Sequence, residues 1–425
     1  MSELSLAKRP PDVNVAHVVD VVILGGGLSG GLCALAIAEH APLLRVAMVE
    51  QSPRLAGNHT WCCHASDLGR LANTSGGAWF WPLVKHRWPQ YLVAFPGFAR
   101  TIDGDYCCVP ADALESAVNR VMARPTHQLL LGERVQSATS TQVLLESGRR
   151  LQARLVLDAR GSRTVKTGCG YQKFLGWEIE SDEAARTLGN LPTLMDARVQ
   201  QLDGYRFVYV LPLSSTRFLI EDTYFSRDSL LDLEAVAGRL RQYLDGLGVG
   251  SYRLLREESG VLPMPWNAGD QLQDVGDVED APVAIGYRAG LFHPATGYSL
   301  GLAAQTADNI ARAIGTARTD DLRYPAASVV AALRTQIDTN LRFAHALNFL
   351  AFRAIPASWL RSLVFEAVYR LPQALLERFY AARTTARDRL VLLGAVARLT
   401  APRFDLAAAH STKSTQSPHL NGETS

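Results

Sequence analysis

The order of hydrophobic and polar residues predicts a β–α–β unit near the start of the chain. A short apolar run at 20–24 is typical of a buried parallel strand and passes directly into a cluster of glycines. Small and aliphatic residues then continue to Ile37, as in a buried helix, and Pro42 ends this segment. The run at 45–50 predicts a second strand, which ends in an acidic residue.

The glycines between the first strand and the helix have a spacing with a physical meaning. Gly25, Gly27 and Gly30 follow G-x-G-x-x-G. The first permits a tight turn, the second lets backbone amides approach a pyrophosphate, and the third lets the helix pack closely on the strand. Glu50, 20 residues after Gly30, stands where a carboxylate binds ribose hydroxyls. A glycine-rich surface loop would leave the flanking periodicity unexplained. The pattern predicts a dinucleotide site for FAD or NAD, and its position near the N-terminus favours FAD.

Two later segments are expected to return to this cofactor. The run 155–162 is a buried strand that ends in Asp158-Ala159-Arg160-Gly161. The run 283–300 is a strand followed by glycines and a polar loop, and a helix then continues to Ile314. The predicted cofactor contacts of these two segments are Asp158, Gly286, His293, Pro294, Thr296 and Gly297. An ordinary tight connection between strand and helix is the alternative for the second.

The segment between these returns carries the candidate acids. Residues 205–213 and 217–222 predict a hairpin whose second arm ends in Glu221-Asp222. Strand alternation places Glu178 and Glu180 on one face of an earlier strand. Residues 76–101 are dense in aromatic side chains, which suits either a cavity wall or plain core packing.

These elements predict an α/β protein with a Rossmann-type FAD-binding domain, an inserted β-sheet domain and a C-terminal helical region. The predicted FAD-binding domain is discontinuous, 18–165 and 276–320, with an aromatic-rich insertion at about 66–104. The predicted substrate-binding sheet domain covers 166–275. Residues 321–404 are predicted to be helical and to contact a membrane, and the Ala-, Ser- and Thr-rich tail 405–425 to be disordered.

Composition narrows the class of protein. The 425 residues are 48% hydrophobic and 20% charged, as in a globular chain of two or three domains. The net charge of +2 is uneven, because residues 341–403 contain ten Arg, no Lys and three acids and so carry +7. Arg residues interleaved with apolar stripes, such as Arg361 and Arg370 beside Leu360 and Val364, favour an anionic surface over nucleic acid. A helical bundle packed on the body is the other interpretation.

The remaining features indicate a reduced, cytoplasmic protein at the membrane surface. Residues 1–19 contain no long apolar run, so we expect no signal peptide, and no window is apolar enough to span a bilayer. The six cysteines include two adjacent pairs and no C-x-x-C spacing, which favours free thiols. His59 and His64 flank Cys62-Cys63, but adjacent side chains diverge, and we expect no metal site.

Taken together, the motifs resemble the bacterial lycopene β-cyclases of carotenoid biosynthesis. The matching pieces are 25–50, Gly57-Asn58-His59-Thr60-Trp61, 158–161, 174–180, Ile220-Glu221-Asp222-Thr223, 286–300 and 369–380. They span nearly the whole chain, and the Ile-Glu-Asp-Thr and Phe-His-Pro-x-Thr-Gly-Tyr-Ser pieces are specific to the family. Cys62-Cys63 departs from the Ser-Phe expected after Trp61.

The resemblance implies a redox-neutral cyclisation of each ψ end of lycopene, by way of γ-carotene to β-carotene. It implies reduced FAD, NAD(P)H as electron donor, and lycopene, a membrane surface and other carotenoid-pathway enzymes as partners. Such chemistry needs a carboxyl group that stays protonated, which burial favours. We expect Glu221 to be the acid or to stabilise the cation, Asp222 to fix the local network, and Glu178 to be the second candidate. Because adjacent strand residues face opposite sides, only one of Glu221 and Asp222 can face substrate. A strand-end acid pair in solvent is the alternative.

Two other functions remain open from the sequence. A flavin-dependent monooxygenase or polyprenyl reductase would share the fold but carry out net redox chemistry. A non-catalytic carrier of apolar isoprenoids would need no acid.

Overall fold

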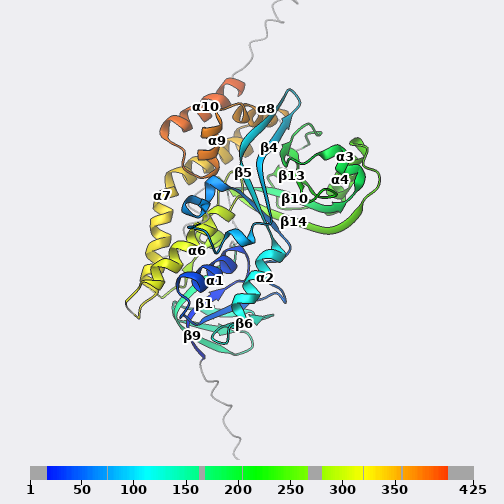
Figure 1. The fold of residues 1–425 in the computed structure, drawn as a ribbon. Coiled ribbons are helices and arrows are strands. Elements are labelled where there is room, and N and C mark those ends of the chain that lie inside the picture. Colours follow the sequence, from blue (N-terminus) through cyan, green and yellow to red (C-terminus); the bar gives the residue numbers. More distant parts are fainter. Residues whose placement is uncertain are drawn as a thin grey trace, which may run out of the picture.

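Two β-sheets and a set of C-terminal helices make up the chain (Figure 1). The computed structural model describes residues 17–400, except 74, 162–167, 203, 267–279, 319 and 356–357. The predicted tail 405–425 and the predicted domain boundaries at 165/166 and 275/276 lie outside these residues.

The first sheet is the predicted dinucleotide-binding unit. Its order in the described chain is β6-β2-β1-β9-β8-β7, with β15 also paired to β9. The strands are β1 His17–Leu24, β2 Val46–Glu50, β6 Gln128–Leu131, β7 Val135–Ala138, β8 Gln142–Leu145, β9 Arg150–Asp158 and β15 Val283–Ala284. β6, β2, β1, β9 and β15 run parallel, so their carboxyl ends meet at one edge. Helices α1 Leu28–His40 and α6 Leu300–Gly315 pack together, with α2 Ala111–Met122 against α1.

The second sheet has the order β14-β10-β13-β12-β11-β4-β5-β3 in the described chain. Its strands are β3 Thr60–His64, β4 His86–Phe95, β5 Phe98–Pro110, β10 Cys169–Glu180, β11 Thr193–Asp196, β12 Tyr205–Pro212, β13 Arg217–Ser226 and β14 Arg253–Pro265. The predicted hairpin is therefore present as β12–β13. The segment 66–104, predicted as an insertion in the FAD-binding domain, instead contributes β4 and part of β5 to this sheet. Long-range strand pairing, which local periodicity does not encode, decides this.

Helices cover both faces of the second sheet. α3 Asp182–Leu188 and α4 Leu233–Gly246 pack on one face, where Val236, Leu240 and Leu244 meet Trp177 and Ile220. The C-terminal helices start with α7 Arg323–Phe349, whose Val330, Leu333 and Ile337 pack in the core of the first sheet, and the chain runs on through a π-helical turn, Leu350–Ala354. α8 Ser358–Tyr369, α9 Gln373–Tyr380 and α10 Ala386–Thr400 follow, and Phe352, Tyr369 and Leu376 pack on the other face of the second sheet. Figure 1 shows α8, α9 and α10 at the end of the molecule opposite β6 and β9, with α7 running along the side between the two ends.

The predicted helical region is present, but its Arg pattern differs from the prediction. Arg361, expected off the apolar stripe, is buried and donates to the carbonyl of Ile355. The side chain of Arg361 is therefore not available at the surface. Arg370, in contrast, is exposed and pairs with Glu366. In the described part of the chain, no helix has the length and apolar character needed to cross a bilayer.

Candidate active site

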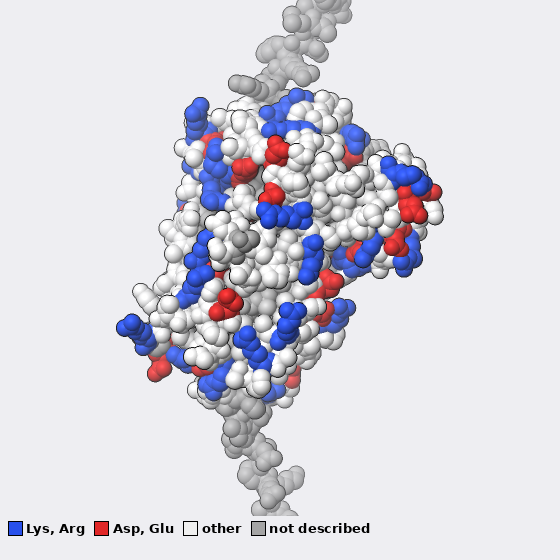
Figure 2. Space-filling view, in the orientation of Figure 1, with Lys and Arg blue, Asp and Glu red and all other residues white. Residues whose placement is uncertain are grey.

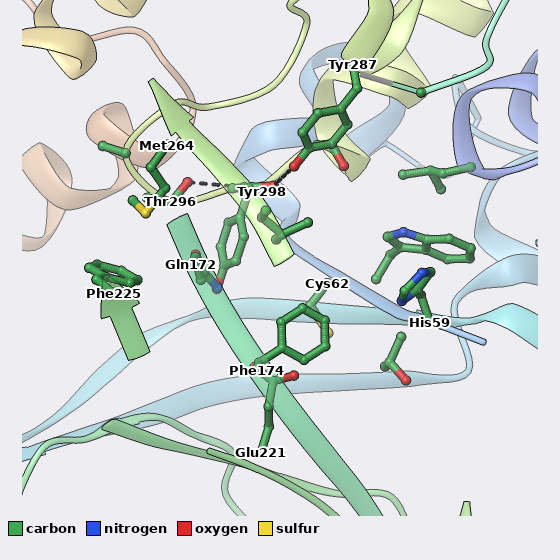
Figure 3. A pocket seen from close by; sticks show the side chains of 18 of the residues that line it. His59, Cys62, Gln172, Phe174, Glu221, Phe225, Met264, Tyr287, Thr296 and Tyr298 are labelled. Atoms are coloured by element: carbon green, nitrogen blue, oxygen red, sulfur yellow. Dashed lines mark hydrogen bonds between the residues drawn. The ribbon is translucent and has the colours of Figure 1, made fainter. Parts of the chain in front are cut away.

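A cavity of about 750 Å³ lies where the carboxyl edge of the first sheet, the second sheet and the C-terminal helices meet. Gly25, Gly27 and Glu50 line one part of it. Aromatic side chains line another, among them Phe174, Phe207, Phe225, Phe352, Phe365 and Phe379. In Figure 3, Glu221 and Phe174 point toward the same space from β13 and β10, with Thr296, Tyr298 and Tyr287 on its far side. The cavity therefore joins a polar, glycine-lined part to an apolar part.

The aromatic-dense segment 76–101 is not the wall of this cavity. Phe80 is fully buried in the core under the first sheet, and Trp79 and Trp81 pack against the same core. Tyr91 and Phe95 lie in the core between the second sheet and the C-terminal helices. Plain packing, the second of the two interpretations, accounts for this segment.

The glycine turn is built as the spacing predicts. Gly25 has φ +98°, and its amide donates to the carbonyl of Val49 at 2.8 Å. A Cβ on Gly30 would lie 1.9 Å from the Gly25 carbonyl oxygen, so only glycine lets helix α1 approach the turn. A Cβ on Gly27 would meet no protein atom within 4 Å, because it would project into the cavity. This open space beside backbone amides at the start of α1 is an anion cradle.

Glu50 ends β2 beside this cradle. Its carboxylate accepts hydrogen bonds from the amides of Gly26 at 2.7 Å and Ser52 at 2.8 Å. These two bonds fix the carboxylate at the cavity wall, which Glu50 lines together with Gln51 and Arg54. A carboxylate held in this way can still accept from a ribose hydroxyl, because each oxygen has a second lone pair.

The second predicted return, the loop before α6, divides into lining and supporting residues. Thr296 and Gly297 line the cavity, and the Tyr287 hydroxyl donates to the Gly297 carbonyl at 2.8 Å (Figure 3). Gly286 has φ +60°, and a Cβ there would lie 2.1 Å from Ser29 Oγ, so this glycine lets the loop pack against the start of α1. It supports the loop and does not line the cavity.

His293 and Pro294 also lie behind the wall. His293 is buried, its Nε2 is 3.0 Å from the carbonyl of Phe379, and burial lowers its pKa to about 4. The ring is therefore neutral near pH 7. The Pro294 carbonyl accepts from the side-chain amide of Asn348 at 2.8 Å. Both residues tie the loop to α7 and α9.

Asp158, at the end of β9, is likewise a supporting residue. Its buried carboxylate pairs with Arg160 and with Arg288, each at 2.7 Å. Arg160 and Gly161, which follow it, line the cavity instead. The predicted turn therefore lies at the cavity, but Asp158, the residue named from the sequence, does not line it.

The three candidate acids have separate environments. Glu221 lines the cavity, whereas Asp222 is fully buried on the other face of β13, paired with Arg206 at 2.6 Å and with Arg239 at 3.1 Å. This matches the alternation that allowed only one of them to face substrate. Glu178 does not line this cavity. It faces a separate cleft, and Arg217 and Arg256 bind its carboxylate.

A further acid, Glu258 on β14, was missed from the sequence. It lines the cavity and is 4% exposed, and its Oε2 accepts from Arg256 at 2.6 Å and from Thr60 at 2.9 Å. Gly176 on β10 is paired with Glu258 on one side and with Glu221 on the other. The two acids thus lie in one row across the sheet. No local pattern predicts this row, because it depends on the register of three strands.

Tyrosine hydroxyls extend from this row toward the loop before α6. Tyr209 is the cross-strand neighbour of Glu221 on β12. Its hydroxyl lies 2.9 Å from that of Tyr106, which lies 2.8 Å from that of Tyr298. Tyr298 directly follows Gly297 at the cavity wall. Three hydrogen-bonded tyrosines thus lie between the row of acids and the loop before α6.

Comparison with known proteins places the chain in a family. A family model described as lycopene cyclase protein matches residues 20–407. The chain belongs to the lycopene cyclase family. Among curated relatives, a lycopene β-cyclase from Pantoea ananas is 36% identical, with 88% of this chain and 94% of that protein covered. One from Paracoccus sp. (strain N81106 / MBIC 01143) is 38% identical, with 87% and 92% covered.

Solved structures give the fold of this cyclase-family chain. A geranylgeranyl bacteriochlorophyll reductase-like protein from Thermoplasma acidophilum is similar with a TM-score of 0.57 and 13% identity, covering 91% of this chain and 97% of that one. A flavoprotein/dehydrogenase from Cytophaga hutchinsonii has a TM-score of 0.58 and 11% identity, covering 90% and 99%. At these identities the similarity concerns the architecture, and it confirms the predicted α/β, Rossmann-type class.

Proposed function

We propose that this chain is a lycopene β-cyclase that closes the ψ ends of lycopene to β rings without net redox change. A proton adds to C2, the C5–C6 double bond attacks the cation at C1, and a proton leaves C6. The observation that carries the proposal is the position of Glu221, a half-buried residue whose carboxyl group faces an apolar cavity that also contains the glycine cradle. Membership of the lycopene cyclase family supports the same substrate class.

Glu221 has the protonation state that this role requires. Burial raises the pKa of Glu221 to about 8, with a further contribution from the negative charge of Glu258. The Thr223 hydroxyl donates to its carboxylate and opposes the shift. At pH 7 the group is mostly the neutral acid, and it can deliver a proton to a double bond held beside it.

The apolar part of the cavity suits a hydrocarbon and a short-lived cation. Phe174, Phe207 and Phe225 line the same cavity as Glu221, and Phe174 lies beside Glu221 (Figure 3). Aromatic faces carry negative potential and attract cations without acting as strong nucleophiles. The same side chains exclude water, which would otherwise capture the cation as an alcohol.

The glycine-lined part of the cavity fits FAD. The start of α1 would hold the pyrophosphate over Gly27, Glu50 would accept from the ribose, and the backbone at Thr296 and Gly297 would lie along the flavin end. Bound in its reduced form, FAD would supply an electron-rich surface that stabilises a nearby carbocation. We further propose NAD(P)H as the electron donor that keeps the cofactor reduced.

We also propose that the C-terminal helices contact a membrane surface, from which lycopene enters. Leu392 and Val396 of α10 line the cavity, while Leu390 of the same helix is 71% exposed and Phe349 is 49% exposed. Figure 2 shows basic side chains standing among uncharged surface at this end of the molecule. We expect the protein to cosediment with phosphatidylglycerol vesicles more than with phosphatidylcholine vesicles, and added salt to weaken binding. Failure to bind either would contradict this part of the proposal.

Expression in a lycopene-accumulating bacterium tests the reaction. We expect β-carotene, with γ-carotene as the intermediate, in the extracted pigments. With purified protein and reduced FAD, product should form anaerobically and without stoichiometric consumption of NAD(P)H. Unchanged lycopene in both assays would overturn the proposal. Stoichiometric NAD(P)H oxidation coupled to substrate would favour a monooxygenase or reductase, the alternatives that share this fold.

A further inference from the structure

Glu221 and Glu258 lie on either side of strand β10, at a position where β10 has a glycine and therefore no side chain between them. Gly176 on the central strand β10 is in register with Glu221 on β13 and with Glu258 on β14. Residues in register across neighbouring strands point to the same face of a sheet. Both carboxyl side chains consequently project from one row into the cavity that they line.

The glycine is required for this approach. A Cβ on Gly176 would lie 3.1 Å from Cγ of Glu258 and 3.6 Å from Cβ of Glu221. The space above Gly176 is therefore already filled by Glu258, Leu219 and the base of the Glu221 side chain, so the two acids are neighbours across a position without a side chain. Two carboxylates in such proximity do not both ionise readily, because each negative charge opposes the other.

The two acids differ in what compensates a negative charge. Oε2 of Glu258 accepts from Arg256 at 2.6 Å and from Thr60 at 2.9 Å. Glu221 accepts from the hydroxyl of Thr223, and within the described residues no Arg or Lys is in salt-bridge range of it. A cation at one acid and none at the other assigns the charge to Glu258 and the proton to Glu221.

We propose that Glu258 and Glu221 act as a charge-coupled carboxyl pair, in which Glu258, held as the anion by Arg256 and Thr60, keeps the proton on Glu221. Glu258 thus acts as a positioning residue for the acid of the cyclisation, and the inference rests on the proposed function. The step balances. The O–H bond of Glu221 and the C1=C2 π bond break as a C–H bond forms at C2, and the C5=C6 π pair then forms the C1–C6 bond. The C6–H pair restores the C5=C6 double bond, the proton from C6 returns to the carboxylate that Glu221 has become, and no net oxidation or reduction occurs. Burial raises the pKa of both acids, and the charge of Glu258 is the second largest contribution at Glu221.

The other ionisable groups around the pair do not offer a competing explanation. The hydroxyl of Tyr209 and the thiol of Cys108 are neutral, because burial raises the pKa of Tyr209, and a hydrogen bond with Cys62 together with burial raises the pKa of Cys108, well above the usual range. Asp222 adds a smaller negative contribution from the opposite face of β13 and is itself paired with two arginines. The charged and titratable groups that face or adjoin the pair are Arg256 on β14, His59 before β3, Cys62 on β3, Cys108 on β5, Tyr209 on β12 and Asp222 on β13. From β10, Glu178 adjoins the pair only through Arg256, which it shares with Glu258.

The test is the pH dependence of kcat/KM in Glu258→Gln, with Glu257→Gln as the matched control. Glu257 is the preceding residue on β14, is exposed and bonds to Trp177 on the other face, so its loss leaves the cavity unchanged. We expect the alkaline limb to move to lower pH by about one unit in E258Q, because the opposing charge is gone, and to stay in place in E257Q. A limb that stays in place in E258Q, or that moves equally in E257Q, would overturn the proposal.

Two further measurements keep the inference testable if folding or turnover fails. Should E258Q not fold, the double variant E258Q/R256Q removes the acid and its cation together. This double change should destabilise the fold less than E258Q alone, which leaves the charge of Arg256 without Glu258. The alkaline limb of kcat/KM should move in the same direction in the double variant. The infrared carbonyl band of neutral Glu221, identified by its absence in E221Q, should titrate near pH 8 in the resting wild type and at lower pH in E258Q. An unshifted band would refute the pair. Absence of turnover in the wild type, with the band shift present, would refute only the proposed function.

Discussion

Glu221→Gln is expected to lower the rate of lycopene cyclisation by about two to four orders of magnitude, the usual contribution of a positioned general acid. The amide has nearly the shape of the acid but cannot deliver a proton. Because Glu221 is neutral at pH 7, its replacement by a neutral amide should cost little stability, and flavin content and melting temperature should stay close to the wild type. The measurement is β-carotene formed per enzyme under anaerobic, reducing conditions.

The E257Q variant is the control for this experiment, since it changes an exposed Glu outside the cavity. It should retain full activity. Retention of most activity by a folded, flavin-containing E221Q would show that another group donates the proton. A wild type as inactive as E221Q would instead favour a non-catalytic carrier of apolar isoprenoids.

The pH dependence follows from the same residue. The reactive form of Glu221 is the protonated one, and burial raises its pKa to about 8. kcat/KM should therefore be high below this value and fall as pH rises through it, the reverse of the behaviour of a carboxylate base. Any residual activity of E221Q should lack this limb.

The sequence predicted the cofactor half of the site more completely than the acid half. Gly25, Gly27, Gly30 and Glu50 act within one strand–turn–helix–strand unit, where spacing along the chain determines spacing in space. Glu258 meets Glu221 only through the register of β14, β10 and β13, and that register depends on contacts far apart in sequence. Glu221 was named from the sequence as the candidate acid, whereas Glu258, its neighbour in the cavity, was not.

Some predicted residues support the wall that they were expected to line. His293 and Asp158 bond to Phe379 and to Arg288, so their polar atoms are used inside the protein. A motif fixes which turn approaches a ligand, whereas which side chain of that turn faces the ligand depends on one or two backbone angles. Glu178 differs for another reason. Glu178 lies two residues after Gly176 on β10, so the two residues point to the same face of the sheet. Glu178 is nevertheless beyond the end of the cavity, and its carboxylate faces a separate cleft, where it pairs with Arg217 and Arg256.

Gly27→Ala is expected to remove FAD while leaving the fold intact. Gly27 has φ −77° and ψ −161°, which alanine adopts without strain, and its new Cβ would meet no protein atom within 4 Å. The methyl group would instead fill the space where the pyrophosphate would approach the backbone amides. Overpacking of this kind costs about 1–3 kcal/mol, which corresponds to FAD binding weakened by about 5- to 150-fold. The measurement is flavin per protein after purification, followed by titration of the apoprotein with FAD.

Gly238→Ala provides the matched control. Gly238 lies in α4, far from the cavity, and a Cβ there also meets nothing within 4 Å. This variant should bind FAD as the wild type does and should melt slightly higher, because alanine is favoured over glycine in a helix by about 1 kcal/mol. If G27A bound FAD as tightly as G238A, the pyrophosphate could not lie against this turn. The cradle at the start of α1 would then have to be abandoned as the cofactor site, even with Glu221 retained as the acid.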